Sequence, residues 1–455
     1  MRARTAEPRR RVFTIGSRHP RMDIPFATRT LANGLRVVVH EDHHVPMAAV
    51  SVWYHVGSRH ERPGLTGFAH LFEHLMFKGS AHHPGGFFEP LQAAGALVNG
   101  STNTDRTNYW EVLPADALEL ALWLESDRMG HLLPALDDGK FATEREVVLN
   151  ERRQNYENRP YGLTSVALAE ALFPAGHPYS WVTIGAPADL VASTVDDARA
   201  FFTRFYHPGN ASLAIAGDVD AEAVFALVDR YFGPLPAGPA VTHPQVPAAL
   251  ERDARLVLED RVELPRLNLA WHSPRMFDDG DAALDLAAEV LAGGKASRLY
   301  RALVHDARLA IDVSAAQASR EMSSVFHVVA TAAPGRTLDE VDGVIRAVLA
   351  EFAATGPTTD ERDRAVARAE AQFVYRLQTI GGFGGKSDQL NAYNVLTGSP
   401  GFFTADLARY ARQTAPAIAD TVRTALVESP RVALSVVPDG EIGLALAGSQ
   451  TVRPS

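Results

Sequence analysis

The chain contains no cysteine among its 455 residues. Disulfide bonds, thiol nucleophiles and thiolate metal ligands are therefore excluded. Lysine is almost as scarce, with four residues, and the net charge of −10 shows no basic excess of the kind that nucleic-acid partners require. No apolar run reaches the length of a membrane-spanning helix. With 46% apolar residues, the chain is still long enough for two or more domains with their own cores.

The first 24 residues form an arginine-rich arm. Residues 1–21 hold seven arginines, one glutamate and two prolines, and no apolar segment of a secretory signal follows them. A transit peptide is one interpretation of this composition. A disordered arm is favoured, because the prolines and the arginine run interrupt an amphipathic helix. We expect a cytoplasmic protein, with periplasmic or organellar import left open.

One short motif carries most of the chemical information. It is His70-Leu71-Phe72-Glu73-His74, which reads H-x-x-E-H within an apolar segment. On a helix the two histidines lie one turn apart on the same face, so they can share one Zn²⁺. The glutamate leans to the same side, close enough to hold a metal-bound water. This order is the inverse of the common zincin motif. An exposed polar helix turn is the alternative, but a buried His-Glu-His cluster without a metal is costly to desolvate.

A site with two histidines needs a third ligand, and Glu151 supplies it 77 residues after His74. Glu144 precedes Glu151 by seven residues and therefore shares its helical face. Standing alone, this segment would equally indicate a solvated charged helix. The upstream motif favours the ligand interpretation, and we predict one zinc ion per chain.

These segments resemble the family of zinc peptidases that includes pitrilysin, insulin-degrading enzyme and the mitochondrial processing peptidase. The matching segments are residues 70–80, 99–109 and 144–151. The resemblance implies that His70, His74 and Glu151 are zinc ligands. It also implies that Glu73 is the general base and that Glu144 is a supporting acid near the site.

The resemblance also implies where a substrate binds. Asn99, Gly100 and Ser101 match a segment that forms an edge strand beside the zinc, and an extended peptide can add to such an edge as a further strand. Glycine at position 100 replaces the usual alanine, which would loosen the strand. An ordinary asparagine-rich turn is the alternative.

The resemblance further implies a partner. In this family two double-domain halves close the catalytic chamber, and fused members are about twice as long as this chain. The half without zinc supplies an Arg and a Tyr that grip the substrate. In the second half of this chain, Arg266 is not in register and alanine stands where the tyrosine is expected. We therefore hypothesise a heterodimer with a homologous chain that lacks H-x-x-E-H, and a homodimer is the second choice.

An internal duplication is indicated by similar segments on either side of a proline-rich stretch. Residues 211–218 resemble 432–439, and residues 53–55 resemble 270–272, at nearly constant offsets. A constant offset is typical of a duplicated domain. We predict an α+β fold with two homologous sheet-plus-helix domains. Their predicted limits are 25–232 and 251–445, joined by a linker at 233–250 with five prolines.

The coarse pattern of each domain is strands followed by helices, which predicts a sheet with helices packed on one face. The expected strands are residues 36–40, 48–56, 97–102 and 108–113, and the expected helices are 115–132 and 141–155. At an offset of 216, His70 and His74 fall on Leu286 and Val290. We therefore expect metal ligands only in the first domain.

Two further histidine pairs, His43-His44 and His82-His83, stand in the same region. Secondary metal sites are one interpretation. Surface loops are favoured, because neither pair has a carboxylate or a cysteine at ligand spacing.

The sequence as a whole favours a zinc-dependent endopeptidase with a peptide substrate. A non-catalytic core-type subunit that retains zinc is the main alternative, and a structural-zinc or zinc-storage protein is another. All four principal positions of the motif are intact, which argues against a non-catalytic core-type subunit. Structural zinc sites usually have four protein ligands, whereas three ligands and a base are present here, which argues against a structural-zinc or zinc-storage protein.

Overall fold

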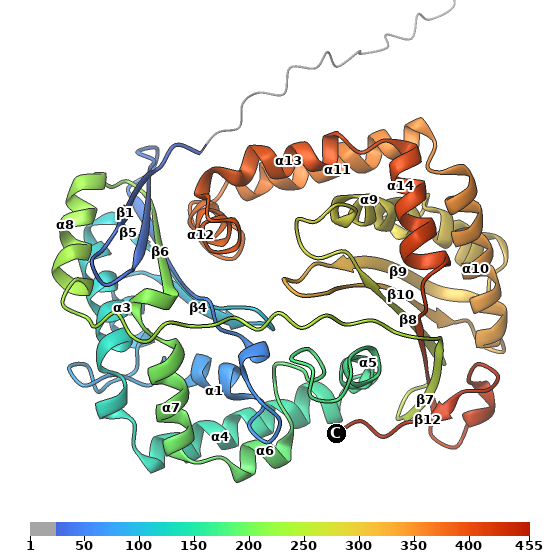
Figure 1. The fold of residues 1–455 in the computed structure, drawn as a ribbon, viewed down its shortest axis with the longest axis horizontal. Coiled ribbons are helices and arrows are strands. Elements are labelled where there is room, and N and C mark those ends of the chain that lie inside the picture. Colours follow the sequence, from blue (N-terminus) through green and yellow to red (C-terminus); the bar gives the residue numbers. More distant parts are fainter. Residues whose placement is uncertain (1–23) are drawn as a thin grey trace, which may run out of the picture.

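The computed structural model describes residues 24–455, so the arginine-rich arm lies outside the described residues except for Ile24. The chain forms two halves that lie side by side along the longest axis of the molecule, each built on one sheet (Figure 1). The predicted fold class, two sheet-plus-helix domains, is confirmed.

Among the described residues, the first half contains a six-stranded sheet and eight α-helices. The strands are β1 (Ala27–Thr30), β2 (Arg36–Glu41), β3 (Met47–Tyr54), β4 (Leu97–Thr102), β5 (Thr107–Pro114) and β6 (Ala211–Gly217). The helices are α1 (Phe68–Leu75), α2 (Phe88–Ala93), α3 (Leu118–His131), α4 (Asp138–Arg152), α5 (Thr164–Leu172), α6 (Pro187–Ala192), α7 (Val195–Phe205) and α8 (Ala221–Phe232).

The second half repeats this plan. Its strands are β7 (Ala254–Asp260), β8 (Arg266–Ser273), β9 (Ala310–Ala318), β10 (Ser324–Ala332), β11 (Val432–Pro438) and β12 (Gln450–Thr451). Its helices are α9 (Asp281–Ala292), α10 (Leu338–Thr355), α11 (Thr359–Arg376), α12 (Lys386–Thr397), α13 (Phe403–Ala411) and α14 (Ala415–Val422).

Five strands of each sheet share the same order and directions. The first runs β1-β2-β6-β3-β5-β4 and the second runs β12-β7-β11-β8-β10-β9. In each sheet one internal pair is parallel, β2 with β6 and β7 with β11, and the next three neighbours are antiparallel. Only the outermost pair differs, because β1 is antiparallel to β2 whereas β12 is parallel to β7. Shared topology of this kind supports an internal duplication.

The prediction that helices cover only one face of each sheet is wrong. In β3 every residue from Ala48 to Tyr54 is buried, so both faces of the strand are covered. The second cover is α12, which comes from the other half of the chain and packs on β3 and β6. The Asn391 side chain of α12 donates to the backbone oxygens of Ser51 (2.8 Å) and Ser212 (3.0 Å).

The first half likewise provides a helix that covers the second sheet. Helix α5 of the first half packs on β8 and β11 of the second sheet. His272 of β8 contacts the last backbone oxygen of α5, that of Leu172, at 2.8 Å. Each half therefore completes the other, because each sheet would otherwise expose an apolar face to water.

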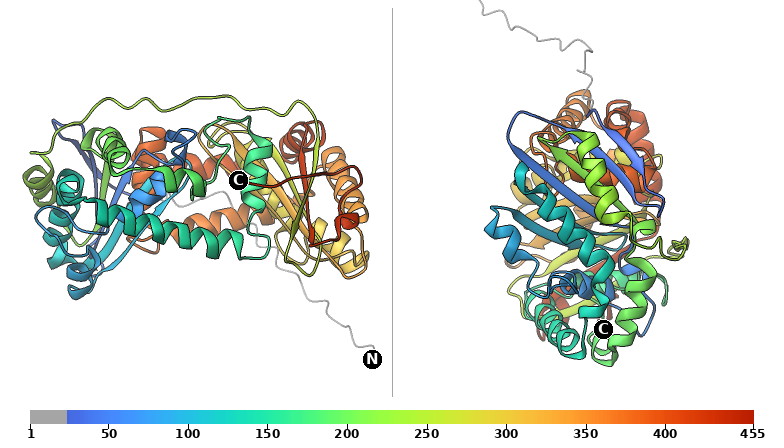
Figure 2. Two further views of the ribbon diagram at one scale, coloured as in Figure 1. Left: turned by 90° about the horizontal axis from the view of Figure 1, so that it is seen from below. Right: turned by 90° about the vertical axis from the view of Figure 1, so that its left-hand side faces the viewer.

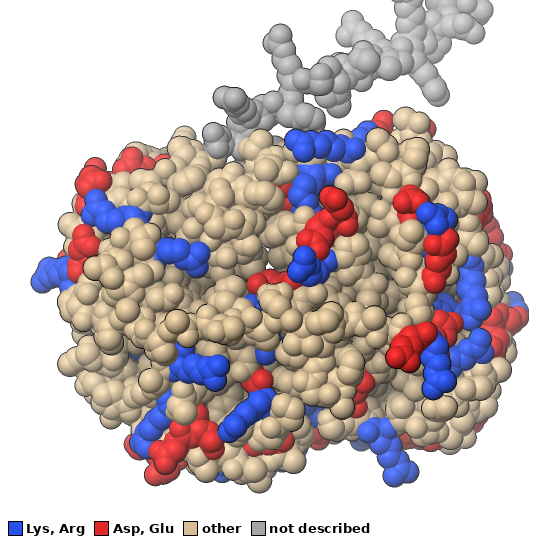
Figure 3. Space-filling view, in the orientation of Figure 1, with Lys and Arg blue, Asp and Glu red and all other residues tan. Residues whose placement is uncertain are grey.

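Residues 233–253 contain no helix or strand within the described structure and run along one side of the molecule from α8 to β7 (Figure 2). On the face seen in Figure 3, acidic and basic side chains are interspersed. Among residues 24–455, no helix is both long and apolar enough to cross a bilayer.

Candidate metal centre

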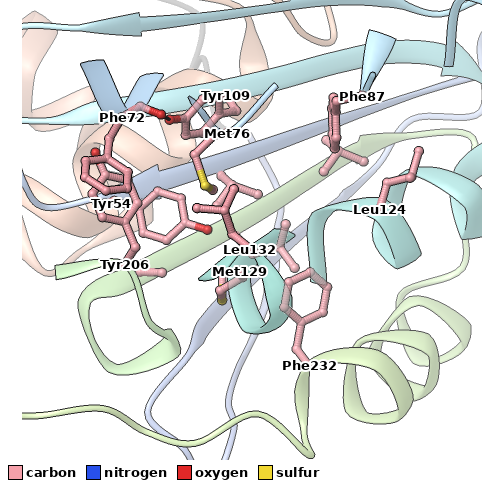
Figure 4. Packing of buried hydrophobic residues seen from close by; sticks show 14 of the residues in the cluster. Tyr54, Phe72, Met76, Phe87, Tyr109, Leu124, Met129, Leu132, Tyr206 and Phe232 are labelled. Atoms are coloured by element: carbon pink, nitrogen blue, oxygen red, sulfur yellow. Dashed lines mark hydrogen bonds between the residues drawn. The ribbon is translucent and has the colours of Figure 1, made fainter. Parts of the chain in front are cut away.

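Helix α1 carries the H-x-x-E-H motif, and its apolar side anchors it in the core of the first half. Phe72 and Met76 are fully buried and lie beside Tyr54, Tyr109 and Tyr206 (Figure 4). The apolar residues within and around the motif therefore point inward, as the sequence predicted. The motif histidines are left on the opposite, partly accessible side of the helix.

Two features fix the N-terminal end of α1: hydrogen bonds to the Glu61 side chain and a close backbone approach at Gly67. The backbone N–H groups of Gly67 and Ala69 donate to the carboxylate of Glu61, at 2.9 and 2.8 Å. This carboxylate satisfies helix donors that would otherwise lack partners. Gly67 has φ of +91°, and a Cβ atom there would lie 2.8 Å from the backbone oxygen of Ile184. Glycine is therefore required where this backbone passes so close to another segment.

The structure brings the three predicted ligands together. The Nε2 atoms of His70 and His74 lie 3.6 and 3.5 Å from the same carboxylate oxygen of Glu151. The two imidazole rings stand 4.8 Å apart at an angle of 77°. Helix α4, which carries Glu151, packs against α1, and its first turn is capped by the Asp137 side chain. Two imidazole nitrogens and one carboxylate oxygen form a typical donor set for Zn²⁺.

Glu144 and Lys78 lie immediately behind the ligands. The Glu144 carboxylate is buried and lies 3.8 Å from Nδ1 of His74, while Lys78 contacts its other oxygen at 3.1 Å. A carboxylate on the second nitrogen of a ligating histidine sets the tautomer and orients the ring. Glu144 therefore faces the site as the sequence predicted. The sequence does not indicate the pairing of Lys78 with Glu144, although Lys78 falls within the segment 70–80.

The charges of the site favour a cation. Burial and the neighbouring His74 lower the pKa of His70 to about 4. Burial acts in the same direction on His74, but the carboxylates of Glu144 and Glu151 outweigh it and raise its pKa to about 9. The site thus gathers carboxylates around two imidazoles, and a divalent cation bound there would compensate their negative charge.

Glu73 lies between the histidines and the edge of the sheet. Burial raises the pKa of its carboxyl group, while a hydrogen bond with Thr102 of β4 opposes this shift. The predicted base is therefore placed against the strand that the sequence assigned to substrate binding.

That strand, β4, is an edge strand, as predicted. The outcome for Gly100 differs from the expectation of a loosened strand. A Cβ atom at this position would lie 3.0 Å from the Tyr109 ring and 3.1 Å from Phe77, so glycine permits close packing here. The Asn99 side chain accepts from the Gly100 N–H at 2.8 Å, and Ser101 donates to Asn108 at 2.7 Å.

A cavity of about 770 Å³ begins at Glu151 and extends to the face of the second sheet. Tyr156 and Tyr161 line it from the first half, and Arg266 and Arg320 from the second. The Arg266 guanidinium stacks on the Tyr161 ring at 3.5 Å. The sequence does not indicate this stacking, because the partner of Arg266 lies in the other half of the chain.

Two family models match the chain. The one described as insulinase, peptidase family M16, matches residues 36–175, and the one described as the peptidase M16 inactive domain matches residues 192–369. The first contains the complete set of candidate ligands. A zinc protease PqqE of Helicobacter pylori is 31% identical over 356 residues, which are 77% of this chain and 80% of that protein.

Solved structures show the same fold. A protease from Helicobacter pylori superposes with a TM-score of 0.84 at 27% identity, covering 91% of this chain and all of that one. The periplasmic protease PqqL from Escherichia coli gives a TM-score of 0.73 at 20% identity. That match covers 92% of this chain but only 48% of the PqqL chain.

Proposed function

This chain belongs to peptidase family M16, and on that premise we propose that it is a zinc-dependent endopeptidase acting on extended peptides. One observation carries the proposal: the imidazoles of His70 and His74 and the carboxylate of Glu151 converge from two helices, with Glu73 beside them. A solvated charged helix would not turn two glutamates toward a pair of histidines.

The residues present fit a zinc ion. Three ligand atoms lie within 4.8 Å of one another, and Glu144 supports one ligand from behind. Three protein ligands leave one coordination position open, as catalytic zinc sites require. When bound there, zinc acts as a Lewis acid that polarises a carbonyl group and lowers the pKa of a water molecule.

Glu73 is the group that moves the proton. It is partly buried, and its carboxyl group interacts with Thr102 of β4. In the proposed reaction it accepts a proton from the attacking water and then delivers it to the leaving amine. The metal ligands cannot do this, because their lone pairs are needed by the cation.

The substrate path is inferred from β4 and the neighbouring cavity. An extended peptide can pair with the outer edge of β4 close to Glu73, with Asn99, Gly100 and Ser101 as its backbone partners. The cavity beside Glu151 then provides room for residues beyond the cleaved bond. The main alternative, a core-type subunit that retains zinc without catalysis, does not explain a carboxylate placed as a base.

We further propose that the working enzyme is a heterodimer. The chain matches only about half of PqqL, which supports the view that it represents one half of a larger catalytic chamber. Its own Arg266 is stacked on Tyr161 within the chain. The partner would be a homologous chain without H-x-x-E-H that supplies an arginine and a tyrosine to the substrate, and a homodimer is the second choice.

The test measures zinc content and peptide cleavage by the purified chain, alone and mixed with homologous ligand-less chains from the same source. We expect zinc in the chain alone, little cleavage alone, and a rise of at least about tenfold in the mixture. Chelation should abolish the activity of the mixture. A thiol-blocking reagent is a suitable control, because a chain without cysteine offers it no target.

A second mixture, made with the Glu73→Gln chain, assigns the activity to this subunit, because it should be inactive. If the zinc-loaded chain alone is as active as every mixture, the heterodimer proposal fails while the peptidase proposal stands. If neither the chain nor any mixture cleaves a broad peptide library, the peptidase proposal itself fails.

A further inference from the structure

A second cluster of metal-ligand side chains lies outside the proposed catalytic site. It consists of His82, in the loop between α1 and α2, and of Asp127 and His131 on α3. We propose that these three residues form a second binding site for a divalent transition metal. This site would take a metal in addition to the one expected from the sequence.

The geometry of this cluster parallels that of the first site. The ligand atoms of each set all lie within 4.8 Å of one another. The rings of His82 and His131 stand 4.7 Å apart at 79°, compared with 4.8 Å and 77° for His70 and His74. Two imidazoles and one carboxylate thus converge in both places. In the second set the paired ligands on α3 are four residues apart, one turn of the same helical face.

The carboxylate of Asp127 is prepared for a ligand role. Its side chain is only 3% exposed, with one oxygen 2.5 Å from Nδ1 of His82. The buried Ser80 hydroxyl donates to the other oxygen. A charged carboxylate with one oxygen oriented by a neighbouring hydroxyl is typical of a supported metal ligand.

The surroundings also favour a cation. His131 is the last residue of α3, and the partial negative charge of a helix C-terminus stabilises a positive charge. The backbone oxygen of His131 accepts from Ala81 at 2.9 Å, so the loop that carries His82 is already held against this end of the helix. A bound metal would replace one hydrogen bond by coordination bonds without moving the loop far.

The donor set selects the class of metal. Imidazole nitrogens favour Zn²⁺, Co²⁺, Ni²⁺ and Cu²⁺, whereas Mg²⁺ and Ca²⁺ prefer oxygen ligands only. His82 lies in an exposed loop, as expected, and no carboxylate stands at ligand spacing from it in the sequence. Asp127 reaches it in the fold from a helix 45 residues further along the chain. His83, next to it, makes a different contact, at 3.3 Å from the Gly86 backbone oxygen.

The experiment titrates the full, tag-free chain with Zn²⁺ alone, after all metal has been removed, and measures equivalents bound by calorimetry and elemental analysis. We expect about two equivalents for the wild type and about one for His82→Ala and for His131→Ala. His83→Ala is the matched control and should retain two. Both cluster histidines are partly or largely exposed, so these variants should fold, and circular dichroism verifies it.

A Glu151→Ala background separates the two sites. In that background one equivalent of Zn²⁺ should remain, and adding His82→Ala should remove it. When Co²⁺ is used instead of Zn²⁺, its visible absorption should also be lost on adding His82→Ala. The proposal is overturned if the wild type saturates at one equivalent that His82→Ala leaves intact. It is also overturned if a second equivalent survives both His82→Ala and His131→Ala. Loss of the proposed catalytic site alone would leave the His82-dependent equivalent in place.

Discussion

Replacing Glu73 with glutamine is expected to leave zinc bound and to reduce peptide hydrolysis by a factor of roughly 10² to 10⁴, the usual contribution of a positioned general base. The amide matches the carboxylate in size and can still accept the hydrogen bond from Thr102. It cannot accept a proton. The loss should therefore fall on kcat, with KM changed little, because peptide binding does not need the proton transfer.

The measurement compares kcat, KM and zinc content of Glu73→Gln with those of Glu146→Gln. Glu146 lies on the exposed side of α4, so its substitution controls for the loss of one negative charge. Turnover by Glu73→Gln close to that of the wild type would remove Glu73 as the base. A fall in zinc content equal to the fall in activity would instead make Glu73 a metal ligand.

The parts of the site that the sequence predicts well are those set by local geometry. His70 and His74 are one helical turn apart, so any helix places them together, and Glu151 follows from the chemistry of a third ligand. Strands β2 and β4 begin at the predicted residues, 36 and 97. A short apolar run after Asn33 and Gly34 defines β2, whereas β4 has only Leu97 and Val98 as apolar residues and follows Gly95.

The parts that it does not predict depend on contacts between segments far apart in the chain. Nothing in the alternation of β3 indicates that its second face is covered by α12, because a helix some 340 residues away provides that cover. In the same way, His82 is one of many loop histidines until α3 brings Asp127 and His131 to it. Gly100 appears as a departure from a family pattern until the Tyr109 ring is placed against it.

Removal of a zinc ligand is expected to have an effect of a different kind from that of Glu73→Gln. In His70→Ala, His74→Ala and Glu151→Ala the first site keeps only two of its three protein ligands. We expect each variant to lose the catalytic zinc at stoichiometric concentrations and with it nearly all hydrolysis. The zinc affinity of Glu144→Ala should lie between that of the wild type and that of these three variants. The removal of a carboxylate that orients a ligating histidine typically weakens metal binding by about 10 to 100-fold without abolishing it.

These variants are best compared in a His82→Ala background, so that only zinc at the first site is counted. Glu146→Ala serves as the control on α4, because its side chain faces away from the site. We expect a larger loss of zinc affinity in Glu151→Ala than in Glu144→Ala. One oxygen of Glu151 lies near both imidazoles, whereas Glu144 contacts only His74 and Lys78. Wild-type zinc affinity in Glu151→Ala would exclude this glutamate as a ligand. An equal loss in Glu144→Ala and Glu151→Ala would mean that both carboxylates bind the metal.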